Sequence, residues 1–598
     1  MIATAILTLF WINASTWKVS AFVIGRPLRS SRGRDTETLK FVAISNKDTF
    51  SEPNDQARRH NRDQDFATNK ETNMHDRELF SVAPLMGHTN RHYRYFFRLL
   101  SQRSHLYTEM VPSAQIVRAY RRARDVYLGP KQSNSKSGFD DVADEDLTLF
   151  HPEEILEVIS RLKDHPEKEF QLHDKDRAIL STTTLGDLLG LSDVVEYPVV
   201  LQLGGNNPKT LASAAAIGKA FSNYDSINLN CGCPSIAVGG RSGGVALMKD
   251  PSLVARCVES MNQSLISLTE VSESHPSSNG KKECPVTIKH RLGARDAVEY
   301  DAMADRQKGD TEAFETCRSF VKTISLGGAV AKCHVHARLG LLGEFQSQRQ
   351  QLWVPGMQGT SSTTRSDHRV KVDHNRVQER AKKRAREATI KNRDIPPLRP
   401  NVVRMLAEEF PDIEFVSNGG IKTLSEVERI VDDGWLEGKT NPIGAMVGRA
   451  VVNHPCSFAS ADILWNLATM GHQRRPSRGE VLQKYIDYCD REEERVEMLV
   501  QRHSLSIEYV SELRKRLAAV PFHLFTGEEG SDAFQRIIKK LAPSKKDINI
   551  KASSILLGAM SFVPSETLDK CVDDYIPWDE IPIYDGYRRS SSMNRVVY

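Results

Sequence analysis

Two asparagines and a thiol stand together at the end of a short apolar segment. The stretch 226–235 reads SINLNCGCPS, and its apolar part runs into a tight glycine–cysteine–proline turn. Because side chains alternate along a strand, Asn228 and Asn230 share one face, and Cys233 follows them at the strand end. Amides donate and accept hydrogen bonds, and a thiol can deliver a proton. A buried strand that ends in a proline turn is the plainer interpretation of the same residues.

The composition is that of a globular chain with extra polar segments. Its 598 residues are 39% hydrophobic and 26% charged, which is enough material for several domains and a sizeable core. A net charge of +4 does not by itself indicate nucleic-acid binding, so such a surface must come from local clusters. Nine scattered cysteines without a CxxC pair indicate separate reduced thiols rather than a disulfide framework.

Residues 1–75 are predicted to be a targeting presequence followed by a disordered spacer. An apolar run over residues 2–12 has the length of a signal-peptide core, and residues 18–34 are rich in Arg and Ser and poor in acid. This succession is similar to the two-part plastid presequence of algae with secondary plastids. A mitochondrial presequence, a cytoplasmic location and a plain secretory signal are the alternatives, and the unpaired cysteines argue against secretion.

Eight apolar runs, separated mostly by helical patterns such as 208–221 and 424–433, occupy residues 76–456. Strands that alternate with helices predict a parallel sheet, and about eight such units predict an α/β fold of the TIM (β/α)8 barrel type. Polar residues and glycines lie at the C-terminal ends of the runs, which is the face where such barrels place active sites. The runs begin near residues 80, 104, 198, 226, 285, 332, 413 and 443.

Three polar stretches interrupt the barrel pattern, and we predict that they are insertions in loops. They cover residues 126–194, 266–284 and 345–390, and the last contains a basic tract. Residues 457–560 show helical patterns only and carry clusters of Lys and Arg. We predict a C-terminal all-helical domain with a surface suited to a phosphate backbone, although basic residues on helices usually only solubilise. The acidic residues 561–598 are predicted to form a loose tail.

Together, these segments resemble the tRNA-dihydrouridine synthases, and in particular the bacterial-type subgroup that acts on the D-loop at positions 20 and 20a. The resemblance covers residues 78–456 apart from the insertions, and the motifs occur in family order. They are Ser81-Val-Ala-Pro-Leu-Met, Leu106-Tyr-Thr-Glu-Met-Val, Leu201-Gln-Leu-Gly-Gly, Asn228-Leu-Asn-Cys-Gly-Cys-Pro-Ser, Val286-Thr-Ile-Lys-His-Arg-Leu-Gly, Val335-His-Ala-Arg, Lys391-Asn-Arg-Asp-Ile-Pro-Pro-Leu, Ser417-Asn-Gly-Gly-Ile-Lys and Met446-Val-Gly-Arg-Ala.

The resemblance implies that FMN lies at the top of the barrel and that NADPH is the reductant. Pro84, Leu85 and Met86 would line the flavin, and Gln202 and Lys289 would hydrogen-bond its ring. The lysine would supply positive charge where the reduced flavin becomes anionic. Without the resemblance, glycines after a strand would only form turns, and a single histidine would be part of the core. The phosphate would be held by His336 and by the backbones of Asn418, Gly419, Gly420, Gly448 and Arg449.

The resemblance also makes Cys233 the general acid in the reduction of the uracil 5,6 double bond. A thiol with the ordinary pKa of about 8.5 is mostly protonated at neutral pH, which suits a proton donor better than a nucleophile. Asn230 would contact the target base or its ribose, and Arg338 and Arg393 would grip substrate phosphate. The target uridine must leave its stack, at a cost of roughly a few kcal/mol. We interpret Cys231 as a packing residue.

Two other functions would use the same residues. One is another flavin barrel that reduces a small molecule, such as a dihydroorotate dehydrogenase or an ene-reductase. The other is a protein that binds tRNA without chemistry. The basic helical region and the spacing Asn230-x-x-Cys233 favour the tRNA-modifying enzyme. We expect tRNA as the partner, a monomer, no bound metal and no stable membrane association, because no apolar run of about 18 residues follows the N-terminus.

Overall fold

The computed structural model describes most of the chain between residues 77 and 577. The described ranges are 77–129, 150–166, 168, 184–190, 197–234, 243–273, 284–343, 395–436, 443–465, 475–503, 507–541 and 550–577. The predicted presequence and spacer, and all of the predicted insertion 345–390 with its basic tract, therefore lie outside the described residues.

Eight strands form a closed parallel barrel, which confirms the predicted TIM fold. Neighbours pair in parallel in the order β2-β1-β11-β10-β8-β6-β5-β4, and β4 also pairs with β2, which closes the ring. The carboxyl ends of all eight strands therefore meet at one rim. The strands are β1 (Phe80–Val82), β2 (His105–Tyr107), β4 (Val199–Gly204), β5 (Ser226–Cys231), β6 (Val286–Arg291), β8 (Lys332–His336), β10 (Glu414–Asn418) and β11 (Gly444–Val447).

Short strands extend the barrel beyond its rim. β3 (Val111–Pro112) continues the pairing along β4. β7 (Ala294–Asp296) and β9 (Gly340–Leu342) form a separate parallel pair just after β6 and β8. The 3-10 helix η3 (Gly244–Lys249) packs against this pair and follows the turn after β5. These pieces build the rim on the side where the thiol lies.

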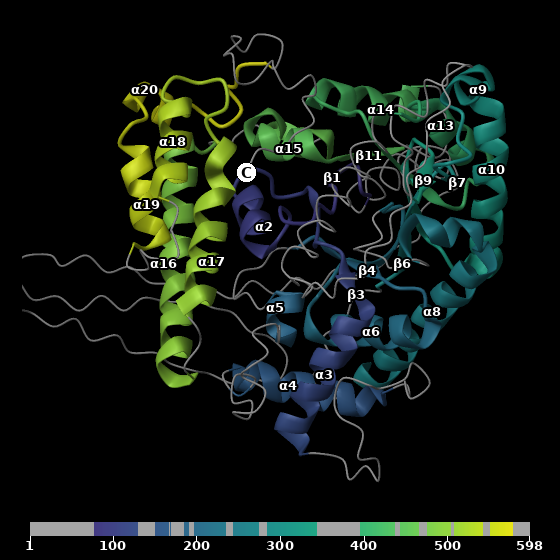
Figure 1. Ribbon diagram of the computed structural model, residues 1–598, viewed down its shortest axis with the longest axis horizontal. Helices are drawn as coiled ribbons and strands as arrows, with labels where there is room; N and C mark the ends of the chain where they lie inside the picture. The colour runs from purple at the N-terminus through teal and green to yellow at the C-terminus, as the bar shows by residue number, and fades with distance from the viewer. Residues whose placement is uncertain are drawn as a thin grey trace, which may run out of the picture. The chain divides into compact units, whose positions relative to one another are not determined.

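Helices cover the outside of the barrel, as Figure 1 shows. The helix α6 has the predicted bounds because Pro208 occupies its first turn and Asn207 Oδ1 accepts from Thr210 N–H at 3.1 Å. The helix α8 continues to Glu273, so the predicted insertion from residue 266 begins inside a helix. The covering helices include α3 (Ser113–Leu128), α6 (Pro208–Phe221), α8 (Pro251–Glu273), α9 (Ala302–Gln307), α10 (Gly309–Ile324), α13 (Pro400–Glu409) and α14 (Leu424–Leu436).

The stretch 126–194, predicted to be a polar loop, contributes to the core. It contains α4 (Pro152–Asp164) and α5 (Leu185–Leu189), and α4 packs on α6 and α8. Four apolar side chains at helical spacing are buried on one face of α4, which explains why this helix adds an outer layer instead of remaining solvated. The stretch predicted to be an insertion in a loop therefore contains a helix, α4, that packs on the barrel helices.

The C-terminal part of the described chain is helical, as predicted. Its elements are α15 (Arg449–Asn453), η5 (Pro455–Trp465), α16 (Arg478–His503), α17 (Ile507–Ala519), η6 (Val520–His523), α18 (Ser531–Leu541), α19 (Ala552–Met560) and α20 (Ser565–Asp569). None of the helices in the described ranges has the length and apolar character needed to cross a membrane.

The prediction of a loose tail is wrong for residues 561–577. Lys570 Nζ forms an ion pair with Glu528 Oε2 at 2.8 Å, and Cys571 makes an antiparallel bridge with Ser477. Val572 is completely buried. The acidic composition misled the prediction because the apolar residues that anchor this segment are few and widely spaced.

The helix α2 (Arg91–Arg98), which follows β1, contacts the helical region. His92 Nδ1 and the Tyr488 hydroxyl share a buried hydrogen bond of 2.8 Å, and the rings of Tyr95 and Tyr488 stack with centroids 4.1 Å apart. Arg91 and Glu492 form an ion pair beside them. A buried polar contact of this kind fixes orientation as well as proximity. The barrel and the α16 helix are therefore joined by specific contacts.

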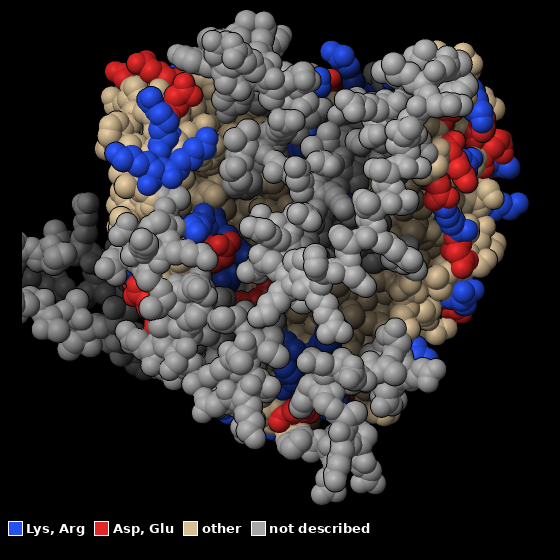
Figure 2. All heavy atoms as spheres, viewed as in Figure 1, with Lys and Arg blue, Asp and Glu red and all other residues tan. Residues whose placement is uncertain are grey.

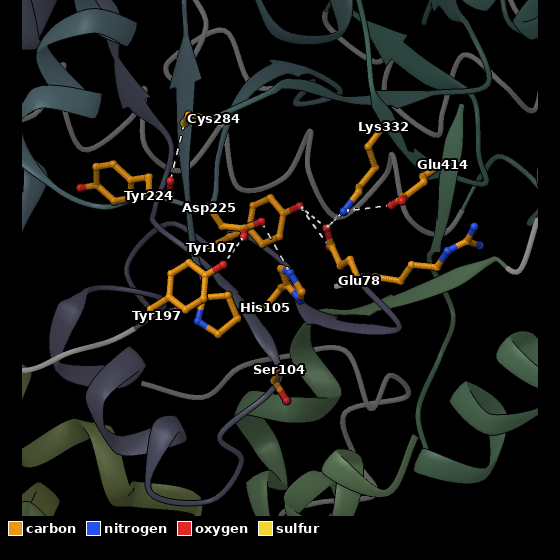
Figure 3. A network of polar contacts seen from close by, with 12 residues as sticks. Glu78, Ser104, His105, Tyr107, Tyr197, Tyr224, Asp225, Cys284, Lys332 and Glu414 are labelled. Carbon is orange, nitrogen blue, oxygen red and sulfur yellow. Dashed lines mark hydrogen bonds and ion pairs between the residues drawn. The ribbon is translucent and has the colours of Figure 1, made fainter. Parts of the chain in front are cut away.

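Charged side chains fill the N-terminal end of the barrel, and Figure 3 shows how they converge. Glu78 lies between Lys332 Nζ at 3.2 Å and His334 Nε2 at 3.0 Å, and it accepts from the Tyr107 hydroxyl at 3.1 Å. Burial opposes ionisation of Glu78, but His334 and Lys332 outweigh it and hold the pKa of this carboxyl well below its ordinary value. Glu414 pairs with Lys332 from the solvent side.

Asp225, in the same network, gives a test of stability against pH. Burial raises its pKa, but His105 lowers it more, to about 2. Because the folded pKa lies below the unfolded one, ionised Asp225 stabilises the fold above about pH 4, and this contribution is lost as the pH falls towards 2. We expect Asp225→Asn to lower the free energy of unfolding at pH 7 by about 2 kcal/mol.

Urea unfolding between pH 2 and 7 measures this effect. The variant should also show a flatter dependence of stability on pH between 4 and 2. Glu157→Gln is the control, because Glu157 pairs with Arg161 at an exposed site and should change stability by less than about 0.5 kcal/mol. Equal stability of Asp225→Asn and the wild type at pH 7 would contradict the assigned role.

Candidate active site

The C-terminal halves of β4, β5 and β6 direct amide and amine side chains into the barrel. Alternation along each strand places Gln202, Asn228, Asn230 and Lys289 in the inward-facing sets. The strand register sets Gln202 opposite Asn228, and Asn230 opposite Lys289. Three of the predicted site residues, from three different strands, are therefore neighbours.

Hydrogen bonds join the buried amides into one chain. Gln202 Nε2 donates to Asn228 Oδ1 at 2.8 Å, and Asn228 Nδ2 donates to Thr287 Oγ1 at 2.9 Å. Asn230 Nδ2 donates to Gln202 Oε1 at 3.1 Å. Buried amides with all these partners keep one orientation. The chain therefore presents a fixed set of polar groups near the rim, and Gln202 retains one N–H beyond these bonds.

Asn230 also holds the turn that carries the thiol. Its Oδ1 accepts from the backbone N–H groups of Gly232 and Cys233, each at 3.0 Å. Val245 N–H donates to the carbonyl of Cys233 at 2.9 Å. Gly244, at φ +60°, packs on the same carbonyl, and a Cβ there would lie 2.3 Å from its oxygen. Among the described contacts, one N–H of the Asn230 amide remains for a ligand.

The two neighbouring cysteines have different environments. Cys231 is completely buried in the core, and burial raises the pKa of its thiol well above the ordinary value. Cys233 is partly exposed at the rim. The interpretation of Cys231 as a packing residue is confirmed. Only the Cys233 thiol of this pair can meet a ligand from the barrel mouth.

Lys289 is a buried cation beside this turn. Its Nζ donates to Asn418 Oδ1 at 2.8 Å, and Asn418 Nδ2 donates in turn to the carbonyl of Met446 at 2.7 Å. Burial lowers the pKa of Lys289 to about 7, with a further contribution from Arg291 and a small opposing one from Cys233. Near neutral pH the amine therefore exists in both forms, and a nearby negative charge would favour the charged one.

Backbone amides with no acceptor gather around His336 at the ends of β8, β10 and β11. Within the described ranges, the N–H groups of Gly419, Gly420 and Gly448 have no hydrogen-bond acceptor, and the His336 ring makes no hydrogen bond. Gly419, at φ +115°, lies against this ring, and a Cβ there would approach its Cδ2 to 2.8 Å. Closely spaced N–H groups of this kind bind anions.

Positive charges surround the same imidazole. Burial lowers the pKa of His336 well below its ordinary value, and the charges of Arg291, Lys289, Arg338 and Arg449 lower it further. Cations that lie this close repel one another unless an anion lies between them. The region around His336 is therefore an anion site by charge as well as by its backbone donors.

The loop after β1 contains Pro84, Leu85 and Met86, the residues predicted to line a flavin. Leu85 N–H donates to Thr89 Oγ1 at 3.0 Å, and the Met86 side chain is 53% exposed. Glu109, which the sequence analysis missed, accepts a hydrogen bond from Gly87 N–H and so anchors the loop. Burial raises the pKa of Glu109 above its ordinary value.

Of the two arginines predicted to bind substrate phosphate, the structure describes only Arg338. The Arg338 guanidinium donates to the carbonyl of Pro396, so it crosses from the end of β8 to the chain that enters α13. Arg393 lies outside the described residues. Arg291 is a second residue that the sequence analysis missed. The two-residue period of β6 signals it, because Arg291 follows Lys289 by two positions and faces the same way.

The site as described combines three chemical elements. A row of amides and an amine can hydrogen-bond a flat polar ring, the His336 region can hold an anion, and the Cys233 thiol can give a proton to a molecule lying between them. Within the described part of the chain, no group of three or more His, Cys, Asp or Glu side chains is arranged to hold a metal ion.

The chain is similar in sequence to known proteins of one kind. The family model described as Dihydrouridine synthase (Dus) matches residues 81–136 and 171–338. The chain is similar to the tRNA-dihydrouridine(20/20a) synthase of Synechocystis sp., with 26% identity over 431 residues, or 71% of this chain and 83% of that protein. Proteins of the same name match from Pseudomonas putida, at 28% identity over 64% of this chain and 70% of that protein, and from Escherichia coli K12, at 27% identity over 67% and 73%.

The bonds of Asn230 predict how the turn responds to substitution. Asn230→Ala removes the acceptor shared by two amides, so we expect hydrogen exchange at Gly232 and Cys233 to become at least about tenfold faster. Exchange followed by mass spectrometry of the peptide over 227–234 measures this. Asn230→Asp keeps an acceptor and should retain most of the protection. Unchanged exchange in Asn230→Ala would show that the turn is held by other contacts.

Proposed function

We propose that the chain is a member of the dihydrouridine synthase family, to whose model and proteins it is similar, and that it reduces the 5,6 double bond of uridine in tRNA to give dihydrouridine. FMN would be the bound cofactor and NADPH the source of electrons. The observation that carries the proposal is the placement of one partly exposed thiol, Cys233, on a fixed turn directly after the strand whose Asn230 lies opposite Lys289.

The residues at the rim fit FMN. The backbone amides of Gly419, Gly420 and Gly448, for which the described residues offer no acceptor, lie beside His336. Together with the charges of Arg338 and Arg449 they match the needs of a phosphate dianion. Gln202 and Lys289 can still donate N–H groups to a ring, and Pro84, Leu85 and Met86 form the adjacent loop. The predicted backbone contacts of Asn418 and Arg449 stay part of this proposal, although the Asn418 carbonyl already accepts from Ala337 N–H at 2.9 Å. When bound, FMN supplies the hydride for one carbon of the double bond.

Cys233 would supply the proton for the other carbon. Its Sγ–H is the donor, and the proton passes to the base as the double bond is reduced. The turn around it is held by Asn230 and Val245, so the thiol needs little reorientation at the moment of transfer. Water or a thiol in solution would then restore the proton.

Lys289 would compensate the negative charge that forms when the flavin is reduced. Its amine, with a pKa of about 7, takes up a proton readily when a negative charge forms nearby. The bond to Asn418 Oδ1 fixes the direction of the amine while leaving its other N–H groups for a ligand. Lys289 would therefore stabilise the reduced, negatively charged flavin more than the oxidised flavin.

The target base and the tRNA backbone would contact other residues. Asn230 offers its remaining N–H to the base or its ribose, and Arg338 and Arg393 offer charge to phosphate. Figure 2 shows Lys and Arg side chains gathered over α18 and α19, where Lys539 Nζ lies 5.0 Å above the Phe522 ring. We propose that this basic helical surface contacts tRNA and that D-loop positions 20 and 20a, as in the names of the relatives, are modified.

A substitution of the thiol tests the reaction. Wild-type protein with FMN and NADPH should add the mass of two hydrogen atoms to a D-loop uridine, and Cys233→Ala should slow this by about 100-fold because the proton donor is lost. Mass spectrometry of digested tRNA measures the product. Cys571→Ala, at an exposed cysteine of the helical region, is the matched control and should keep full activity. NADPH oxidation with orotate or an enone, while tRNA stays unchanged, would contradict the proposal.

A glycine substitution tests the phosphate site separately. Gly419→Ala puts a Cβ against the His336 ring at a φ that disfavours side chains, so the affinity for FMN should fall by at least about tenfold. Titration of flavin-free protein, followed by quenching of FMN fluorescence, measures it. Gly309→Ala has a similarly positive φ with open space around its Cβ, and it should bind FMN normally. Equal affinities of the two variants would place the phosphate elsewhere.

A further inference from the structure

Arg291 ends β6 and turns its side chain into the rim, where it joins two loops. The residue is only 4% exposed. Its Nε donates to the carbonyl of Gly232 at 2.9 Å, and its Nη1 donates to the carbonyl of Leu339, also at 2.9 Å. The first carbonyl belongs to the turn after β5, and the second follows β8. One guanidinium thus connects chain segments more than a hundred residues apart.

The first of these bonds adds to the contacts that hold the backbone of the turn at Cys233. Asn230 holds the N–H groups of Gly232 and Cys233, and Val245 holds the carbonyl of Cys233. The carbonyl of Gly232 is the remaining backbone group between them, and Arg291 is its donor. The peptide that precedes Cys233 is therefore fixed on both its N–H and its C=O sides, although the turn has no regular secondary structure.

The second bond reaches the segment that carries His336 and Arg338. Leu339 directly follows these residues, and the next residue, Gly340, donates its N–H to the carbonyl of Gly293 at 2.8 Å. Gly340 leaves room for the arginine: a Cβ there would lie 3.0 Å from Arg291 Cδ and 2.2 Å from Val245 Cγ2. The aliphatic part of Arg291 therefore lies beside Gly340 together with Val245, whose N–H donates to the carbonyl of Cys233.

We propose that Arg291 is a positioning residue that sets the place of the Cys233 thiol relative to the anion site at His336. The inference rests on the proposed function, because it assigns Arg291 to the delivery of the proton. A planar guanidinium reaches two carbonyls in fixed directions, whereas a lysine amine in the same space can reach only one of them well. Arg291 therefore acts through Cys233 rather than on the substrate.

The two halves of the reaction separate this role from a general effect on the fold. Reduction of the bound flavin by NADPH does not use the thiol, and reoxidation by tRNA does. In Arg291→Met we expect the first rate to stay within about twofold and the second to fall by about 10- to 100-fold. Arg291→Lys should recover part of the loss. Stopped-flow absorbance of the flavin measures both rates.

Alkylation of the thiol gives a readout that does not need activity. Iodoacetamide labelling of Cys233, followed by mass spectrometry, should be at least about fivefold faster in Arg291→Met because the turn is loosened. Arg318→Met is the matched control, since Arg318 pairs with Glu409 on the outer helices, and it should label like the wild type. If Arg291→Met does not fold, the same comparison is made with Arg291→Lys, which should label at least about twofold faster than the wild type.

Two results would overturn the inference. One is labelling and reoxidation rates in the Arg291 variants equal to those of Arg318→Met. The other is an equal loss of both half-reactions together with loss of flavin, which would make Arg291 part of the cofactor site. A wild-type protein that leaves tRNA unmodified would refute the proposed function instead, and the labelling comparison would still decide whether Arg291 holds the turn.

Discussion

The pairing of β4 with β2 closes a ring of eight parallel strands, and the geometry of the site depends on this closure. Parallel strands in a closed ring all end at one rim, so side chains from separate parts of the sequence must meet there. Asn230, Lys289 and Asn418 come from three strands, yet Asn230 lies opposite Lys289 in the register and Lys289 bonds to Asn418. Each strand needs to contribute only one or two suitable residues.

Burial of polar groups then decides how these residues are arranged. An amide taken out of water needs partners, and Gln202, Asn228 and Thr287 provide them for one another. Asn230 belongs to the same chain and also accepts from the turn at Cys233. The contacts that satisfy the interior of the barrel are therefore the contacts that orient the thiol. The same hydrogen bonds thus satisfy the buried amides and fix the turn at Cys233.

The two ends of the barrel use buried charge in opposite ways. At the N-terminal end Lys332 pairs with Glu78, and these partners raise its pKa against the effect of burial. At the rim, burial lowers the pKa of Lys289, and neighbouring cations add to the same effect at His336. Compensated charge stabilises the fold, whereas uncompensated positive charge favours the binding of an anion. The placement of carboxylates thus distinguishes the structural end from the functional one.

By itself, the sequence determined the barrel, the bounds of the helix 208–221 and the contrast between Cys231 and Cys233. Alternation, capping and motif order depend on neighbours along the chain, so they can be recognised without a structure. Only the tertiary structure decided that Arg291 reaches Gly232, that Glu109 anchors the loop at Gly87, and that α4 and residues 561–577 pack into the fold. These contacts join residues far apart in the chain, and no local pattern specifies which distant groups will be brought together.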